Sequence, residues 1–242
     1  LLTVVRPSAP DRDRALADAQ AILGGALTYA LAQGEAPEAL LTVADSPWDE
    51  IPRVARSRRC AALVLGMTAL DDRVQGGALE RLLNELPDVD VAVLHAPAGW
   101  APEAARRIMI PLGGQGTHDA IRARVLGSLL RTDTDRQVTF VRCVPEDDGA
   151  ALAVAERTLA DAAVGIPGSV ARVLPCTDPT AALIAEARNH DLVLLGLSRH
   201  GRSRAFGAVT LPIAASAGAA LMLAGADSGP GLLAQVGWPG GR

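Results

Sequence analysis

The chain has 242 residues, of which 49% are apolar but only 2% aromatic, and this length suits one large or two ordinary domains with a core of Ala, Val and Leu. A formal net charge of −4 gives no general attraction to nucleic acid or anionic lipid, and the scarcity of aromatic rings argues against base stacking. No apolar run approaches the roughly 18 residues of a membrane span, so we expect the chain itself to be soluble and not membrane-spanning.

All 23 basic residues are arginine, because the sequence contains no lysine. That absence excludes a P-loop lysine, a Schiff-base lysine and a kinase-type catalytic lysine. The cysteines Cys60, Cys143 and Cys176 have no Cys-x-x-Cys spacing, and the four histidines are scattered singly. We therefore expect no metal site, free thiols and a reducing, cytosolic setting.

Strands and helices are predicted to alternate from the first residues onward, with a junction between two halves near 97–102. In the first half, Gly24-Gly25 could mark a break in the first helix. The predicted strands are 2–5, 40–44, 62–65 and 89–95, and the predicted helices are 12–32, 47–57 and 77–86.

The second half continues the same alternation, which predicts doubly wound, mostly parallel sheets with right-handed crossovers. Asp178-Pro179 opens one helix, with Asp as the cap and Pro at the first helical position. The predicted strands are 107–112, 137–144, 170–174, 192–197 and 220–224, and the predicted helices are 118–131, 150–163, one from 179 onward, and 208–217.

Two segments of the first half recur in the second. Ala62–Met67 (ALVLGM) matches Leu192–Leu197 (LVLLGL) at an offset of 196 − 66 = 130, and Leu2–Pro7 (LTVVRP) matches Val138–Pro145 (VTFVRCVP) at 139 − 3 = 136. Similar offsets, in order along the chain, indicate a duplicated domain. We expect an α/β fold of two tandem, Rossmann-like halves, 1–97 and 98–226, followed by a Gly/Pro-rich tail at 227–242.

The first copy is incomplete, because nothing in it corresponds to the strand 107–112 and the helix 118–131 that open the second. We interpret the chain as a fragment cut inside a domain. The alternative is an intact protein with a divergent first half.

The last strand of the second half, 220–224, is apolar throughout and would form a sheet edge, which predicts pairing with another chain and hence a homodimer. The equivalent strand of the first half, 91–94, has a similar edge. The two halves could instead pair with each other, and a dimer would then use helices or the tail.

Ligands of open α/β sheets bind outside the carboxyl ends of the strands, where the strand order reverses. Two glycine-containing loops are predicted there, after 107–112 and after 192–197, and the second is rich in arginine. Glycines allow backbone amides to approach a phosphate, and a helix N-terminus favours negative charge. A solvated basic loop is the alternative. The candidate residues for an anion or nucleotide are Gly113, Gly114, Gly196, Ser198, Arg199, Gly201, Arg202, Gly207 and Thr210.

With GLSRHGRSRAFGAVT after its fourth strand, the second half resembles the universal stress protein fold. Nucleotide-binding members carry Gly-x2-Gly-x9-Gly-Ser/Thr in this loop and an Asp at the end of the first strand. Here four residues separate Gly196 from Gly201 and five separate Gly201 from Gly207, so neither spacing matches the motif. Ala208 replaces the Ser or Thr, and Leu112-Gly113 stands where the Asp is expected. The resemblance implies the fold, whereas ATP or another nucleotide as a ligand is in doubt.

A narrower resemblance rests on IMIPLGGQGTHDAIRARVLGSLLRT, VTFVRCVPED and GLSRHGRSRAFGAVTLPIAASAGAALML. These segments are similar to the C-terminal region of bacterial transporters of the amino acid permease or cation–chloride cotransporter type. The resemblance implies a non-catalytic, dimerising regulatory domain with no cofactor. It also implies a cytoplasmic location at the inner face of the membrane, joined to the transmembrane domain of the same polypeptide.

Three functions therefore remain open: a transporter's regulatory and dimerisation domain, a stand-alone tandem stress protein that binds an adenine nucleotide, and an adenylate-handling hydrolase. The hydrolase has the least support, because the sequence contains no Gly-x-Ser-x-Gly elbow and no His-Glu-x-x-His. We expect no catalytic residues. The carboxylate pairs Asp71-Asp72 and Asp147-Asp148 fall in predicted turns, where solvation accounts for them.

Overall fold

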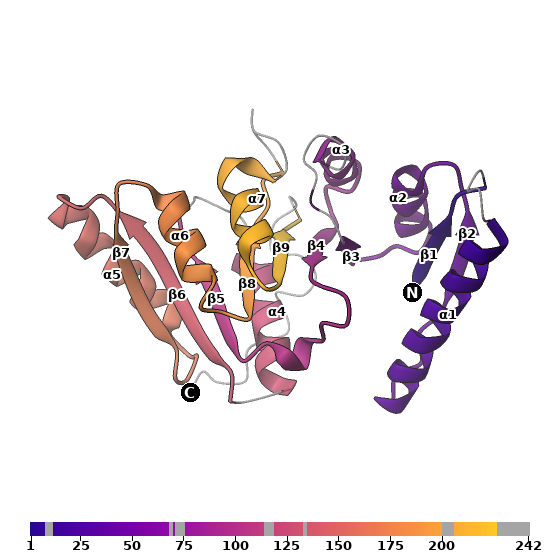
Figure 1. The fold of residues 1–242 in the computed structure, drawn as a ribbon, viewed down its shortest axis with the longest axis horizontal. Coiled ribbons are helices and arrows are strands. Elements are labelled where there is room, and N and C mark those ends of the chain that lie inside the picture. The colour runs from indigo at the N-terminus through magenta and orange to yellow at the C-terminus, as the bar shows by residue number, and fades with distance from the viewer. Residues whose placement is uncertain are drawn as a thin grey trace. The chain divides into compact units, whose positions relative to one another are not determined.

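Strands and helices alternate along the chain as the sequence predicts, in a computed structural model that describes residues 1–7, 12–67, 70, 76–113, 119–132, 135–199 and 206–226 (Figure 1). The α/β class and the mostly parallel sheet are confirmed. The chain divides into two units, Leu1–Cys60 and Ala61–Arg242, which are described separately below. In order, the elements are β1 (Leu2–Val5), α1 (Arg12–Ala32), β2 (Leu40–Val43), α2 (Pro47–Ser57), β3 (Ala62–Met67), α3 (Gly77–Glu85), β4 (Asp90–His95), a 3-10 turn η2 (Pro102–Ala104), β5 (Arg107–Pro111), α4 (Asp119–Thr132), β6 (Gln137–Val144), α5 (Gly149–Ala163), β7 (Val170–Pro175), α6 (Pro179–Ala187), β8 (Leu192–Gly196), α7 (Gly207–Ser216) and β9 (Ala220–Ala224).

The first unit contains a two-stranded parallel sheet, in which β1 pairs with β2 and Leu2 lies opposite Leu40. α1 provides the crossover that a parallel pair requires, and it buries Ala19 and Leu23. Parallel sheets are normally covered on both faces. In this unit only Val5 of the two strands is fully buried.

The helix α1 differs from expectation in two respects. It is continuous over 21 residues, so Gly24-Gly25 does not break it. Among the described residues, α1 is also the one helix that is long and apolar enough to cross a membrane, judged by length and composition alone. The mean hydropathy of its 18-residue window is 1.2, and 11% of that window is buried. A helix packed in a protein core can pass the same test of length and composition.

Repetition of a buried face accounts for part of that hydropathy. Leu16, Ala19 and Leu23 of α1 recur as Leu152, Ala155 and Leu159 of α5, at the offset of 136 that also relates β1 to β6. Ala19 and Leu23 are buried, and so are Ala155 and Leu159. The apolar stripe of α1 therefore matches that of a helix packed on a sheet.

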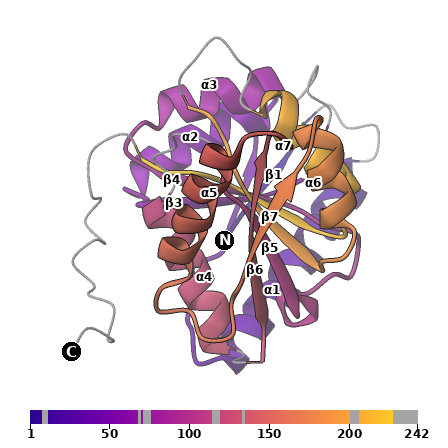
Figure 2. The same ribbon diagram turned by 90° about the vertical axis from the view of Figure 1, so that its left-hand side faces the viewer.

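The second unit contains a seven-stranded sheet with the order β3-β4-β9-β8-β5-β6-β7. Neighbouring strands run parallel except β4 and β9, which pair antiparallel with Val93 opposite Met222. Figure 2 shows α4 and α5 on one face of this sheet and α6 and α7 on the other. As predicted, Asp178 caps α6, since its carboxylate accepts hydrogen bonds from the backbone N–H groups of Thr180 and Ala181 at 2.9 and 3.1 Å.

The sequence suggested one sheet for each repeat, but the strands are not divided in that way. β3 and β4 of the first repeat join the sheet of the second, because β4 pairs with β9. β9 is therefore paired on both edges, with β8 and β4, and its edge cannot recruit another chain. Of the two arrangements left open by the sequence, pairing within the chain is the one observed.

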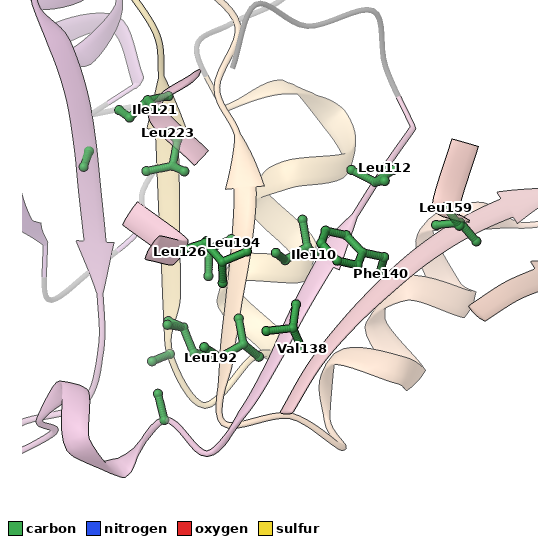
Figure 3. Close-up of a cluster of buried hydrophobic side chains, with 14 residues drawn as sticks. Ile110, Leu112, Ile121, Leu126, Val138, Phe140, Leu159, Leu192, Leu194 and Leu223 are labelled. Atoms are coloured by element: carbon green, nitrogen blue, oxygen red, sulfur yellow. The ribbon is translucent and has the colours of Figure 1, made fainter. Parts of the chain in front are cut away.

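The main core lies between the sheet of the second unit and its helices (Figure 3). It joins Ile110 of β5, Phe140 of β6 and Leu194 of β8 to Leu126 of α4 and Leu159 of α5. With phenylalanine at only two positions in the chain, this core is mostly aliphatic, as the composition predicts.

The described part of the first repeat differs from the second repeat in its central strand. In the second repeat β5 lies between β6 and β8 and pairs with both. β1 corresponds to β6 and β3 to β8, but no strand in the described part of the first repeat corresponds to β5. β1–β2 and β3–β4 belong to separate sheets.

Candidate functional site

The predicted anion loops follow two neighbouring strands. From β5 the chain proceeds to β6 and β7 on one side, and from β8 it proceeds to β9 on the other, so the strand order reverses between β5 and β8. Because these two strands are parallel, Gly113 after β5 and Gly196 at the end of β8 lie at the same edge of the sheet. This is the position where open α/β sheets bind ligands.

Small residues leave space at this edge. A Cβ atom built on Gly113 would meet nothing within 4 Å. Gly207 opens α7 with a φ of 64°, a left-handed conformation that favours glycine. No side chain caps the first turn of α7 at Phe206, which leaves its amide groups oriented as at other helix N-termini that receive anions.

Thr210 lies one turn into α7, where its hydroxyl donates a hydrogen bond to the carbonyl of Gly196 at 3.2 Å. This bond fixes the start of α7 to the end of β8. The hydroxyl oxygen retains its capacity to accept a hydrogen bond, but its proton is used within the fold. Ser198 is half-buried between these elements.

Arg199 does not act as the anion ligand that the sequence suggested. Its side chain is 9% exposed, and its guanidinium donates hydrogen bonds to the carbonyls of Leu83 and Leu86 at 2.9 Å each. It also donates to the carbonyls of Val89 and Gly225. Since these bonds satisfy a buried charge with backbone oxygens, Arg199 connects the loop after β8 to the α3–β4 turn and to the end of β9.

Other predicted members of this loop, Gly114, Gly201 and Arg202, lie outside the described residues. At the end of β5, where nucleotide-binding stress proteins carry Asp, Leu112 is 9% exposed and Gly113 is exposed. Within the described part of this edge, the candidate site therefore consists of glycine backbone, the Thr210 hydroxyl and the start of α7.

A charged cluster that the sequence analysis treated as punctuation occupies the opposite edge of the sheet. The carboxylate of Asp191 accepts hydrogen bonds from the backbone N–H of Arg107 at 2.8 Å and from its guanidinium at 2.9 Å. Burial acts to raise the pKa of Asp191, but the hydrogen bonds and charge of Arg107 outweigh it and hold that pKa below its ordinary value. Asp191 thus joins the amino ends of β8 and β5.

A cavity of about 440 Å³ adjoins this cluster. Trp100, Arg107, Arg188 and His190 are among its lining residues. His190 is buried, and its Nδ1 donates a hydrogen bond to the carbonyl of Glu186 at 3.0 Å. The cavity therefore lies at the amino ends of β5 and β8, away from the glycine edge where ligands of such sheets bind.

Two cysteines lie near each other at the carboxyl ends of β6 and β7. Cys143 is half-buried, and its pKa is raised to about 12 by burial first and then by the hydrogen bond and charge of Cys176. Its thiol also lies 3.8 Å from the carbonyl of Pro179. Among the described residues, no group of three or more His, Cys, Asp or Glu side chains could hold a metal ion.

Comparison with known proteins identifies the fold. No protein-family model and no curated protein sequence matches the chain. Among solved structures, a universal stress protein from Archaeoglobus fulgidus DSM 4304 matches with a TM-score of 0.60 and 13% identity, over 93% of this chain and 85% of that one. The chain has a universal stress protein-like fold.

The same fold occurs in a membrane-protein context. The cytoplasmic domain of a prokaryotic cation chloride cotransporter matches with a TM-score of 0.63 and 14% identity, over 96% of this chain and 86% of that domain. At these identities the matches establish the shared universal stress protein-like architecture.

Proposed function

We propose that this chain is a non-catalytic regulatory and dimerisation domain on the cytoplasmic side of a membrane transporter, of the amino acid permease or cation–chloride cotransporter type. The observation that carries the proposal is the position of Arg199. The arginine that would be expected to meet a phosphate in the loop after β8 is buried and binds backbone carbonyls across the two repeats.

The junction between the repeats is secured at a second point. Asp90, at the start of β4, accepts hydrogen bonds from Arg124 of α4 and, at 2.8 Å, from the backbone N–H of Ala226 after β9. Asp90 and Arg199 each link elements of the first repeat to elements of the second. Charged side chains that join the repeats through backbone carbonyls and an ion pair suit regulation better than catalysis, and the likeness to a transporter's cytoplasmic domain supports this choice.

Dimerisation in this proposal uses surfaces other than the edge of β9, because β4 already occupies that edge. Sedimentation at micromolar concentration tests it directly. A dimer of the 24.9 kDa chain is expected, and a monomer at all concentrations would remove dimerisation from the function.

Nucleotide binding separates the proposal from its alternative, a stand-alone stress protein that binds ATP. The alternative is favoured by Gly113, Gly196 and the uncapped start of α7, which lie where such folds bind ligands. Calorimetry with ATP, ADP and a cyclic dinucleotide is the test. We expect no binding tighter than about 1 mM, because the loop lacks an available arginine in its described part and an Asp after β5.

Matched glycine variants make that test specific. A Cβ atom at Gly113 or at Gly66 meets nothing within 4 Å, so both Gly113→Val and Gly66→Val should fold. Micromolar ATP binding that is lost in Gly113→Val and kept in Gly66→Val would favour the nucleotide-binding alternative. For the transporter role, deleting this domain from the complete polypeptide should change solute flux without changing the amount of protein in the membrane.

A further inference from the structure

A buried histidine at the amino ends of the strands leaves half of its hydrogen-bonding capacity unused. Nδ1 of His190 donates to the carbonyl of Glu186, whereas Nε2 has no hydrogen-bond partner in the described part of the chain. The residue is only 9% exposed and lines the cavity of about 440 Å³ described above. Nε2 is accessible rather than enclosed, so it opens into that cavity. A buried polar group that meets no protein atom there is suited to contact a ligand.

Positive charge lines the same cavity. Arg107 and Arg188 are both lining residues, and the carboxylate of Asp191 pairs with Arg107. Arg188 is exposed, and among the described residues its guanidinium has no hydrogen bond or ion pair. With the histidine counted as neutral, two arginines against one aspartate leave the lining with a net charge of +1. A ligand with one negative charge balances it, and a guanidinium can bind a carboxylate through two parallel hydrogen bonds.

The cavity also offers apolar surface. Trp100 is half-buried against the main core and lines the cavity together with Pro97. Ser216 is a further lining residue, but its hydroxyl donates to the carbonyl of Pro212 at 2.8 Å, so its proton is used within α7. An aromatic or branched group packs well against an indole ring. The lining therefore suits a ligand with a charged head and an apolar body.

We propose that this cavity binds a small organic monoanion, a carboxylate with a hydroxyl group on the adjacent carbon and an apolar body. The guanidinium of Arg188 binds the carboxylate, and the apolar body packs on Trp100. Because Nδ1 of His190 holds the proton of the neutral ring, Nε2 accepts a hydrogen bond, which the ligand's hydroxyl donates. The site lies within the second unit, at the edge opposite the glycine loops, so it does not depend on the function proposed above.

Two other ligand classes match this lining less well. A phosphate group carries roughly two negative charges, more than the lining balances, and it has no apolar body to cover Trp100. An amino acid could donate from its ammonium group to Nε2 of His190. Its zwitterion, however, brings no net negative charge to a cavity with a net charge of +1.

Calorimetric titration of the 242-residue chain with 3-phenyllactate tests the charged contact. We expect a dissociation constant of about 1 mM or below. Arg188→Gln should weaken binding by about tenfold or more, because a charge-assisted hydrogen bond is lost. The matched control is Arg157→Gln, which removes an exposed arginine from α5, on the face of the sheet away from α6, and should bind as the parent does (Figure 2). No binding up to about 10 mM, or equal binding by the two variants, would overturn the proposal.

A pair of ligands tests the hydroxyl contact. 3-Phenylpropionate lacks only the hydroxyl, so it should bind the parent about fivefold more weakly than 3-phenyllactate. His190→Asn keeps a side-chain N–H for the carbonyl of Glu186 but has no atom in place of Nε2, so it should bind both ligands equally. A hydroxyl preference that persists in His190→Asn would overturn the proposal. Tighter binding of phenylalanine than of 3-phenyllactate would also overturn it, since the site would then select an amino acid. Because Arg188 is exposed, its variant should fold whether or not His190→Asn does, and the charge test stands by itself.

Discussion

The strands β3 and β8 have nearly the same sequence but opposite environments. ALVLGM forms β3 at the end of the sheet, with Val64 exposed, whereas LVLLG forms β8 between β5 and β9, where four of its five residues are buried. Continuous apolar runs are typical of parallel strands covered on both faces. The apolar run in β3 is therefore typical of a strand inside a sheet, although β3 lies at its end. The neighbours of each strand determine how much of the run is buried.

The strands β4 and β9 provide the opposite case. They too are equivalent in the repeat, and both are largely buried because each pairs with the other across the antiparallel junction. Burial in the second unit thus follows pairing: β4, which pairs on both edges, is largely buried, whereas β3, at the end of the sheet, is not.

The largest expected effect comes from shortening the same position in each repeat. Leu194→Ala should cost about 2–5 kcal/mol of unfolding free energy, because it opens a cavity in the main core. Val64→Ala should change it by less than about 0.5 kcal/mol, since that side chain is largely in solvent. Urea unfolding of the two variants measures both values. Similar costs would show that β3 is buried in solution.

A somewhat smaller loss is expected at the junction of the repeats. Arg199→Met should destabilise the chain by about 2–3 kcal/mol, because several buried carbonyls lose their donors. Arg199→Lys should recover only part of this, since an ammonium cannot match the planar fork of a guanidinium. Thermal unfolding measures the loss, with the exposed Arg188→Met as the matched control. An Arg199→Met variant as stable as that control would contradict the role of Arg199 in holding the repeats together.

The order of elements was predictable because periodicity is a local property. Strand–helix alternation, the caps at Asp178 and the position of β9 all follow from short segments of sequence. Which strands share a sheet did not follow, because β4 and β9 lie far apart in the chain and local periodicity carries no information on which distant strands pair. The sequence allowed this pairing and its alternative equally.

Within the candidate site, the position of the glycine loop was predictable and the role of its arginine was not. Gly113 and Gly196 lie at the reversal of strand order because sheet topology places them there. Arg199 instead binds the carbonyls of Leu83 and Leu86, more than 100 residues earlier in the chain. An arginine beside glycines looks the same in sequence whether it meets a ligand or a backbone, so no local signal distinguished the two.

The ion pair at the amino ends of β5 and β8 should contribute less than Arg199. Because the pKa of Asp191 is lowered in the folded state, its contribution is present above the ordinary Asp pKa and is lost as pH falls through the folded value. Asp191→Asn should cost about 1 kcal/mol at pH 7, since the pair is partly exposed. The gap between variant and parent should close below about pH 4. Urea unfolding from pH 3 to pH 7 measures it, and a gap that does not change with pH would assign the effect to hydrogen bonding alone.

The smallest effect is expected at Cys143, on the outer side of the well-packed repeat. Its pKa in the folded state, about 12, lies above the ordinary value of 9.0, mainly through burial and then through Cys176. A raised pKa means that the folded state holds its proton longer than the unfolded state. The stabilisation is therefore complete below about pH 9 and is lost as pH rises toward 12. Cys143→Ala should remove this decline, which unfolding measurements between pH 8 and pH 11 can follow.

The thiolate is the reactive form, so Cys143 should also alkylate slowly at pH 8 and somewhat faster in Cys176→Ala, where burial remains but the neighbouring thiol is gone. Rapid alkylation of Cys143 in the folded parent chain would contradict the raised pKa.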